Sequence, residues 1–364
     1  MAHDVAANPH APGFQHLVGG YPESGAAINL AGRENTGFRG LTRWFGHENN
    51  IAEILWFAVS AQLRNFGPTE SPAILPAMAS KPQIAIIGPG RLGSALALEL
   101  QRAGYRVREV ISRNNRASRK RAQELAKRLR AHASSSETAR IDAPLIWFCV
   151  PDREITKAAH DLEQATAWKG KIAFHSSGAL ASDELDALRK RGASAASVHP
   201  MMTFVRGSVP SLQNVPFALE GDASAVLVAR RIVKDLGGNG FSVSKKNKAA
   251  YHAWGGFISP LLVLTLVAGE RVARAAGFSA EDARKNMLPI VRQTLANYAK
   301  LGPAAAFTGP IGRGDVATVR KHLGVLKKIP EAREVYVALA RVALRHLPVQ
   351  NRKELRKLLR ASRT

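Results

Sequence analysis

The sequence is poor in cysteine: Cys149 is the only one among 364 residues. A single cysteine excludes a disulfide framework within the chain and is typical of a reducing compartment. The N-terminus also lacks the succession of charged, apolar and small residues that marks a secretory signal peptide. These absences predict a cytoplasmic protein.

Long apolar runs are also lacking. The most apolar stretch extends from about Ala253 to Ala268 and is interrupted by Gly255, Gly256 and Pro260. It is shorter than the roughly 18 to 20 residues that a membrane-spanning helix needs. We therefore expect a buried helix here and no membrane association.

Acidic residues are scarce. Asp and Glu number 28 against 52 Lys and Arg, which gives a net charge of +24. The positive charge is concentrated in Arg113 to Arg130 and in the tail, Asn351 to Thr364. Such regions attract polyanions, but the chain shows no zinc-finger, RNA-recognition or regular recognition-helix pattern. Solvated basic helix faces are the favoured interpretation, and nucleic-acid association is a less favoured alternative.

Four regions follow from composition and periodicity. Residues 1–78 are rich in Gly, Asn, His and Pro, which predicts a poorly ordered N-terminal extension. Residues 79–245 alternate strand and helix patterns. Residues 246–347 show helical periodicity, which predicts a helical C-terminal domain, and residues 348–364 form a basic tail.

The alternating region predicts an α/β fold, a doubly wound and mostly parallel Rossmann sheet, followed by an all-helical C-terminal domain. The expected strands are 83–87, 106–111, 145–150, 172–174, 195–198, 215–219 and 241–243. The expected helices are 92–103, 116–130, 223–236, 249–276, 280–301, 316–327 and 331–347, with a short helix in the tail.

A glycine-rich loop follows the first expected strand and opens the first helix. It reads Gly88-Pro89-Gly90-Arg91-Leu92-Gly93. In this context Gly88 permits a tight turn, Gly90 lets the backbone approach a pyrophosphate, and Gly93 lets the helix pack on the strand. The N–H groups and the positive end of the helix dipole would then hold the phosphates.

The end of the second strand indicates which dinucleotide is bound. An NAD site usually has an acidic residue about 20 positions after the loop. Here that count reaches Arg113, preceded by Ser112, and Arg116 lies nearby. An arginine suits a ribose 2′-phosphate, so NADP is expected over NAD. The competing acidic residue, Glu109, lies within the strand.

Polar residues follow three strands, at the sheet edge where open α/β sheets bind ligands. They form three segments: Val150-Pro151-Asp152, His175-Ser176-Ser177 and His199-Pro200. Val150 and Pro151 are expected beside the cofactor, His175 and Ser176 in catalysis, and Ser177 and His199 beside the substrate. Turn capping by serine and packed histidines are the alternative.

Three polar residues open the helical domain: Lys248, Tyr251 and His252. Their spacing of three and four places them on one helix face. Lys248 is the first candidate for a proton donor, His252 would orient it, and Tyr251 would contact the substrate. No HExxH or His-x-His pattern accompanies them, so no metal is expected.

The quoted motifs resemble a bacterial family that pairs a Rossmann-like domain with the domain of unknown function 2520. The resemblance covers about Lys81 to Leu323 and rests on IAIIGPGRLGSALA, FCVPDREI, FHSSGAL, SVHPMMTF, KAAYHAWGGF and LGPAAAFTGPIGRGDVATVRKHL. It implies an NADP-binding domain and a helical domain that forms a homodimer. It implies no particular reaction.

A more distant similarity is to pyrroline-5-carboxylate reductases and β-hydroxyacid dehydrogenases. In the dehydrogenases a catalytic lysine precedes an asparagine by four positions, and Lys248 resembles that lysine. His252 stands where the asparagine would be, a departure that weakens the transfer of mechanism. The prediction is an NADP(H)-dependent oxidoreductase acting on a small carbonyl, imine or hydroxyacid. A non-catalytic NADP-binding sensor or dimerising scaffold is the alternative.

Overall fold

The computed structural model describes residues 81–361. The predicted N-terminal extension, residues 1–78, lies outside the described residues. The strands are β1 Ile84–Ile87, β2 Val107–Ser112, β3 His132–Ser135, β4 Leu145–Phe148, β5 Ile172–His175, β6 Ser194–Pro200, β7 Pro216–Gly221 and β8 Asn239–Ser242. The helices are α2 Arg91–Arg102, α3 Arg116–Leu129, α4 Ile155–Asp161, α5 Asp186–Arg189, α6 Ala223–Asp235, α7 Lys248–Ile258, α8 Pro260–Ala275, α9 Ala280–Ala306, α10 Val316–Leu326, α11 Pro330–His346 and α12 Arg352–Ala361. Short 3₁₀ turns are η1 Asp152–Glu154, η2 Ser182–Leu185 and η3 Lys245–Asn247.

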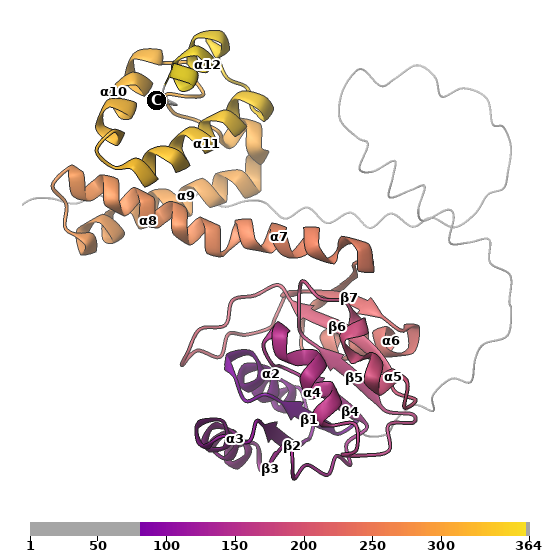
Figure 1. Ribbon diagram of the computed structural model, residues 1–364. Coiled ribbons are helices and arrows are strands. Elements are labelled where there is room, and N and C mark those ends of the chain that lie inside the picture. The colour runs from indigo at the N-terminus through magenta and orange to yellow at the C-terminus, as the bar shows by residue number, and fades with distance from the viewer. Residues whose placement is uncertain (1–80, 362–364) are drawn as a thin grey trace, which may run out of the picture. The chain divides into compact units, whose positions relative to one another are not determined.

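The eight strands form one sheet in the order β3-β2-β1-β4-β5-β6-β7-β8 (Figure 1). All neighbours pair in parallel except β6 and β7, which are antiparallel. The strand order reverses between β1 and β4, which is where open α/β sheets bind ligands. The predicted doubly wound, mostly parallel sheet followed by a helical region is confirmed.

Both faces of the sheet are covered, as the apolar strands predicted. In β1, Ile84 and Ile86 join a core with α2, α3 and α6, whereas Ala85 and Ile87 join a second core with α4 and α5. This alternation follows from the two-residue period of a strand. The sheet is therefore held rigidly, and the loops at its edge are built on a packed scaffold.

One strand was missed by the sequence reasoning. β3 reads His-Ala-Ser-Ser and forms the outer edge of the sheet beside β2. Its residues are mostly exposed or half-buried, so it lacks the apolar pattern by which the other strands were recognised.

The helix expected over 249–276 is two helices. The backbone leaves the helical conformation at Ser259 (φ −125°, ψ −85°), and α8 begins at Pro260. Proline has no N–H to donate and disfavours a helical conformation in the residue before it, so a new helix starts there.

The expectation of a buried helix over Ala253 to Ala268 was wrong. No residue of α8 is buried in the single chain, and Phe257 of α7 is 69% exposed. By length and composition alone, the segment Lys245–Ala275 also passes the test for a membrane-spanning helix. The sequence showed that these side chains are apolar, but it did not show that the chain's own core leaves them uncovered.

The basic tail contributes to the core of the helical region. Leu355 and Leu359 of α12 are buried against Val319 and Leu323 of α10 and Leu344 of α11. The tail helix is amphipathic, and Leu355 and Leu359 on its apolar face are buried within the chain.

Candidate functional site

The glycine loop has the geometry that its residues predicted. Gly88 has φ +97°, and its N–H donates to the Ile111 carbonyl at 2.8 Å. A Cβ atom at Gly93 would lie 2.1 Å from the Gly88 carbonyl oxygen, a steric clash. Only glycine, which has no Cβ, fits at this position. A Cβ at Gly90 would meet nothing nearer than 4.0 Å, so that glycine leaves open space above the loop.

The loop ends at an uncapped helix N-terminus. α2 begins with Arg91 and Leu92, and no side chain accepts a hydrogen bond from its first N–H groups. Leu92 packs against the core and Arg91 is exposed. Free N–H groups at the positive end of a 12-residue helix, beside an open glycine, suit a phosphate.

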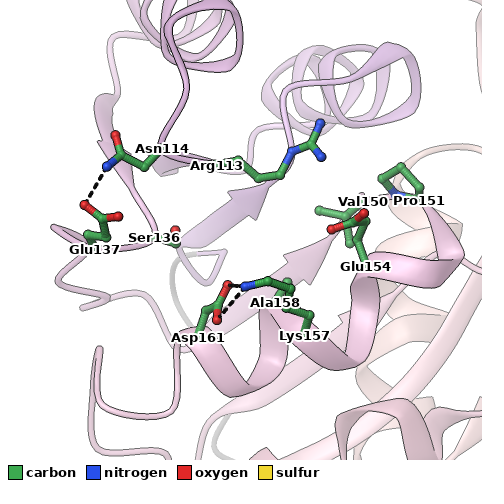
Figure 2. Close-up of a pocket in the computed structure, with 10 residues that line it drawn as sticks. All are labelled: Arg113, Asn114, Ser136, Glu137, Val150, Pro151, Glu154, Lys157, Ala158 and Asp161. Carbon is green, nitrogen blue, oxygen red and sulfur yellow. Dashed lines mark hydrogen bonds and ion pairs between the residues drawn. The ribbon is translucent and has the colours of Figure 1, made fainter.

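Two adjoining hollows extend from this loop along the ends of β2 and β4. The inner one, of about 180 Å³, is lined by Gly88, Gly90, Ser112, Arg121, Val150 and Pro151 among others. The outer one, of about 380 Å³, shares Arg113, Val150 and Pro151 and extends to Glu154 and Lys157 (Figure 2). We call the two hollows together the dinucleotide groove.

Three cationic side chains line the dinucleotide groove: Arg113, Arg121 and Lys157, of which Lys157 pairs with Asp161. Arg113 is exposed, and Arg121 Nη2 donates to Ser118 Oγ at 3.0 Å. Arg116 is not among the residues lining the groove. Ser112 is buried, with Oγ 3.2 Å from the Arg113 carbonyl oxygen. Arg113 at the end of β2 and Arg121 on α3 therefore fit a phosphate on the ribose.

Glu109 does not compete for the ribose. It is buried within β2, and its carboxylate accepts a hydrogen bond from Ser134 Oγ at 2.6 Å. Burial raises the pKa of this carboxyl above its usual value. The acidic alternative that would favour NAD thus points away from the position a ribose would take at the strand end.

His175 is buried at the end of β5, and the half-buried Ser176 directly follows it. Ser177 N–H donates to His175 Nδ1 at 3.1 Å, and His175 Nε2 lies 2.9 Å from the Ala181 carbonyl oxygen. His175 has no exposed surface, and burial lowers its pKa to about 4. Trp147 Nε1 donates to Ser176 Oγ at 2.8 Å. Both side chains therefore have hydrogen-bond partners within the protein, and their catalytic role stays a prediction.

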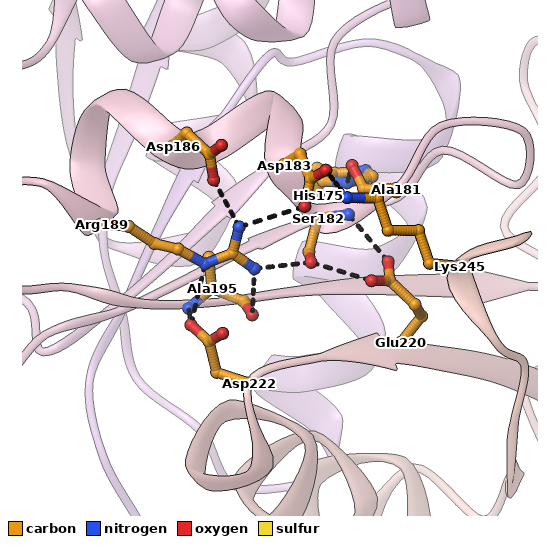
Figure 3. Close-up of polar contacts among 10 residues, drawn as sticks. All are labelled: His175, Ala181, Ser182, Asp183, Asp186, Arg189, Ala195, Glu220, Asp222 and Lys245. Carbon is orange, nitrogen blue, oxygen red and sulfur yellow. Dashed lines mark hydrogen bonds and ion pairs between the residues drawn. The ribbon is translucent and has the colours of Figure 1, made fainter.

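A charged network fixes the far side of that loop (Figure 3). Glu220 of β7 accepts from Ser182 N–H at 2.7 Å, and Arg189 Nε donates to Asp222 at 3.0 Å. The loop that follows His175 is thereby tied to β7 and α6. This connection holds Ser177 and Gly178 in place.

Lys248 is buried beneath the same loop. It is 2% exposed, and its ammonium donates to the Ser177 carbonyl at 2.9 Å and to Ser197 Oγ. Burial lowers the pKa of Lys248 to about 8, against the attraction of Glu220 and Asp152. The amine is therefore enclosed by protein partners.

His199, Tyr251 and His252 come together around Gly178. His199 Nδ1 lies 2.7 Å from the Tyr251 hydroxyl, and the His199 and His252 ring centres are 6.2 Å apart. A Cβ at Gly178 would lie 2.7 Å from His252 Cδ2 and 2.9 Å from His199 Nε2. We call these three side chains, with the Lys248 beneath them, the histidine cluster.

The protonation states within the histidine cluster follow from burial. Burial, and then the positive charge of Lys248, lower the pKa of His199 to about 4. Burial raises the pKa of Tyr251 to about 12. At neutral pH the tyrosine keeps its proton and the imidazole is neutral, and in the tautomer that accepts from the hydroxyl through Nδ1 the ring hydrogen lies on Nε2. His199 is thus a neutral hydrogen-bond donor, and His252 is exposed beside it.

Two contributors were not singled out from the sequence. Ser197 lies within an apolar strand and accepts from Lys248, and its only signal is its spacing of two from His199, which places both on one face of β6. Arg121 lies on α3, about one and a half helical turns after the start of that helix, where no local motif marks it.

The fold and the dinucleotide groove define a Rossmann-type domain with a helical partner domain. Family models agree: residues 67–200 match the Rossmann-like domain and residues 215–343 match the Domain of unknown function (DUF2520). The chain therefore joins these two domains, which confirms the resemblance seen in its sequence. No curated protein matches it.

Solved structures share this fold. A candidate NADP oxidoreductase from Bacteroides fragilis is 20% identical, with a TM-score of 0.60 over 72% of this chain and 97% of that one. An imine reductase from Myxococcus stipitatus in complex with NADP⁺ is 19% identical, with a TM-score of 0.55 over 76% and 100%. A reductive aminase from Aspergillus terreus, in complex with NADPH and ethyl-5-oxohexanoate, is 17% identical, with a TM-score of 0.53 over 77% and 100%.

Proposed function

We propose that this protein is a cytoplasmic NADP(H)-dependent oxidoreductase that acts on a small carbonyl, imine or hydroxyacid. The observation that carries the proposal is the link between the groove and the cluster. Pro151 lines the dinucleotide groove, and the next residue, Asp152, accepts a hydrogen bond from Ser177 Oγ at 2.8 Å. Ser177 in turn is held by Lys248 and precedes Gly178 at the histidine cluster. A cofactor site and a set of proton-handling side chains are thus joined by one short chain of contacts.

The residues of the dinucleotide groove fit NADP. The uncapped N-terminus of α2 and the open space at Gly90 suit a pyrophosphate, and Arg113 with Arg121 suits a 2′-phosphate. The NADP⁺ of the Myxococcus stipitatus imine reductase and the NADPH of the Aspergillus terreus enzyme support this assignment. When bound, NADPH would supply the hydride.

The histidine cluster would supply the proton. His199 Nε2–H donates a hydrogen bond to the carbonyl oxygen or imine nitrogen and polarises the double bond. The exposed His252, in its protonated form, would give a proton to that oxygen or nitrogen, and it would regain one from water. Tyr251 fixes the His199 tautomer through the contact with Nδ1.

Lys248 acts as a positioning residue in this scheme, in place of the proton donor expected from its resemblance. Its buried charge holds Ser177 and Ser197 and keeps His199 neutral. Lys248→Met should lower turnover with NADPH affinity unchanged, and it should raise the His199 pKa measured by NMR because a nearby positive charge is lost. An unchanged His199 pKa would contradict this role.

The function is tested in two steps. Fluorescence titration should give micromolar NADPH affinity and much weaker NADH affinity. A screen of small ketones, cyclic imines and hydroxyacids, followed by absorbance at the nicotinamide band, should then give turnover that His199→Phe removes. NADPH binding without turnover on any class would instead favour the non-catalytic sensor or scaffold.

We further propose that a second copy of this chain covers the exposed apolar face of α7, α8 and α9. Exposed side chains on this face include Trp254, Phe257, Leu261, Leu264, Leu295 and Tyr298. An apolar surface of this extent on a globular protein marks an interaction site. α9 also carries Arg284, Lys285, Arg292 and Lys300, charges that a bilayer would exclude and that a protein interface accommodates at its rim.

Sedimentation velocity tests this partner. The wild-type chain should sediment as a dimer, and the double variant Phe257→Glu, Leu264→Glu should sediment as a monomer. Arg108→Glu, on the exposed surface of β2, is the control and should remain dimeric. A monomeric wild-type chain that co-sediments with lipid vesicles would overturn the proposal.

A further inference from the structure

A second charged hollow lies far along the chain from the dinucleotide groove, between α11 and α12. It has a volume of about 360 Å³ and is lined by Arg341, Leu344, Arg345, Arg356, Leu359 and Arg360. Leu344 and Leu359 are buried and form its floor, whereas Arg345, Arg356 and Arg360 are exposed. We call it the arginine hollow.

The arginine hollow gathers like charges without neutralising them. Arg341 and Arg345 are four residues apart on α11, and Arg356 and Arg360 are four apart on α12, so each pair shares one helix face. Among residues 81–361, no carboxylate lines the hollow and none of the ion pairs involves these four arginines. Such an arrangement repels itself, and a bound anion would relieve the repulsion.

Basic residues continue on the other side of α12. A hollow of about 780 Å³ there has three cationic side chains and one carboxylate among its lining residues: Arg320, Lys327, Arg333 and Glu334. The segment 313–361 contains thirteen lysines and arginines and four acidic residues. The positive surface therefore extends across one helix, which favours a ligand with several phosphates over a single small anion.

The same helix does not fit a bilayer. A basic amphipathic helix that binds a membrane inserts its apolar face between the lipids. In α12 that face, Leu355 and Leu359, is 1% and 2% exposed, because it packs against α10 and α11. Only the charged face is available, and a charged face without an apolar one suits a phosphate backbone.

We propose that the arginine hollow and the basic surface around α12 bind the phosphodiester backbone of nucleic acid, independently of base sequence. Arg345, Arg356 and Arg360 would contact phosphates through their guanidinium groups. Arg341 has a partial structural role, because its Nη2 donates to the Leu359 carbonyl at 3.1 Å.

Binding of a fluorescein-labelled 20-base-pair DNA duplex to the full chain tests this proposal. The triple variant Arg345→Gln, Arg356→Gln, Arg360→Gln should weaken binding by about tenfold or more and lower the slope of log Kd against log salt by about 2 to 3. The control removes the same charge elsewhere, at exposed Arg106→Gln, Lys169→Gln and Lys190→Gln, and should change Kd by less than about twofold. NADPH affinity and the melting temperature should be unchanged in both.

Equal weakening by the two triple variants, or no DNA binding by the wild-type chain, would overturn the site. Tighter binding to phosphatidylserine vesicles than to DNA, lost in the arginine variant, would overturn the assignment to nucleic acid. Inorganic tripolyphosphate is the competitor that separates the two phosphate sources. Displacement of DNA only at large excess supports a backbone ligand, and displacement at equal concentration assigns the site to free polyphosphate instead.

Discussion

The dinucleotide groove and the histidine cluster are built in different ways. The groove is framed by segments that directly follow strands and by residues of α3 and α4, and its charges at Arg113 and Lys157 are open to solvent. The cluster joins His199 of β6 with Lys248, Tyr251 and His252 of α7, and Lys248 also contacts Ser177 and Ser197 at the sheet edge. Its polar groups are largely buried and satisfy one another.

The difference shows what each region needs from the chain. A groove for a charged, flexible ligand requires backbone shape and a few exposed charges, which a local motif can specify. A proton-handling cluster requires groups with altered pKa values, and burial provides these. Variants in the groove should therefore change binding, and variants in the cluster should change turnover or pH dependence.

Gly93→Ala should have the largest effect on binding. The added Cβ would lie 2.1 Å from the Gly88 carbonyl oxygen, so the loop has to move. Its N–H groups would then no longer point toward the pyrophosphate. We expect at least about a hundredfold loss of NADPH affinity by fluorescence titration. Gly324→Ala on α10, where an added Cβ meets nothing, is the control and should bind normally. Equal affinity in both variants would remove the loop from the cofactor site.

His199→Phe should separate turnover from binding. It removes the Nε2–H donor and keeps a ring of similar shape, so kcat should fall by about a hundredfold. The NADPH dissociation constant should stay within about twofold, because His199 does not line the dinucleotide groove. Tyr251→Phe should lower kcat less, and the double variant should be no worse than His199→Phe alone. A parallel loss of NADPH affinity would mean that the two regions are not separable.

The sequence predicted these two regions unequally. Seven of the eight strands and the glycine loop lie where they were predicted, because contiguous residues specify them, and Arg113 lines the groove that begins at this loop. Lys248, Tyr251 and His252 were found as a trio by helical spacing, but their orientation was not. Ser197, which accepts from Lys248, lies in a run of alanine and valine, and only the β5–β6 pairing brings it beneath Ser177. Burial of Lys248 and exposure of Phe257 likewise depend on which surfaces meet, and periodicity does not report this.

Stability against pH should reveal the buried histidines. The pKa of His175 is about 4 in the folded chain, against an ordinary value of 6.5. The unfolded chain thus binds more protons between these values, so the contribution is complete above pH 6.5 and is lost as the pH falls towards 4. Urea unfolding should show a loss of up to about 3 kcal/mol from this group, which His175→Gln abolishes. The exposed His346→Gln is the control and should keep the wild-type pH dependence.

Arg113→Ala should have the smallest effect and the most selective one. The exposed guanidinium would bind the 2′-phosphate, and loss of such a charge-assisted hydrogen bond costs about 1.5 to 3 kcal/mol. NADPH affinity should fall by about tenfold while NADH affinity is unchanged, because NADH carries no phosphate there. Arg116→Ala, which removes an exposed arginine that does not line the groove, should change NADPH affinity by less than about twofold. If the two variants weaken NADPH binding equally, the general positive charge around the start of α3 selects the cofactor. The dinucleotide groove would then lack the specific contact between Arg113 and the 2′-phosphate.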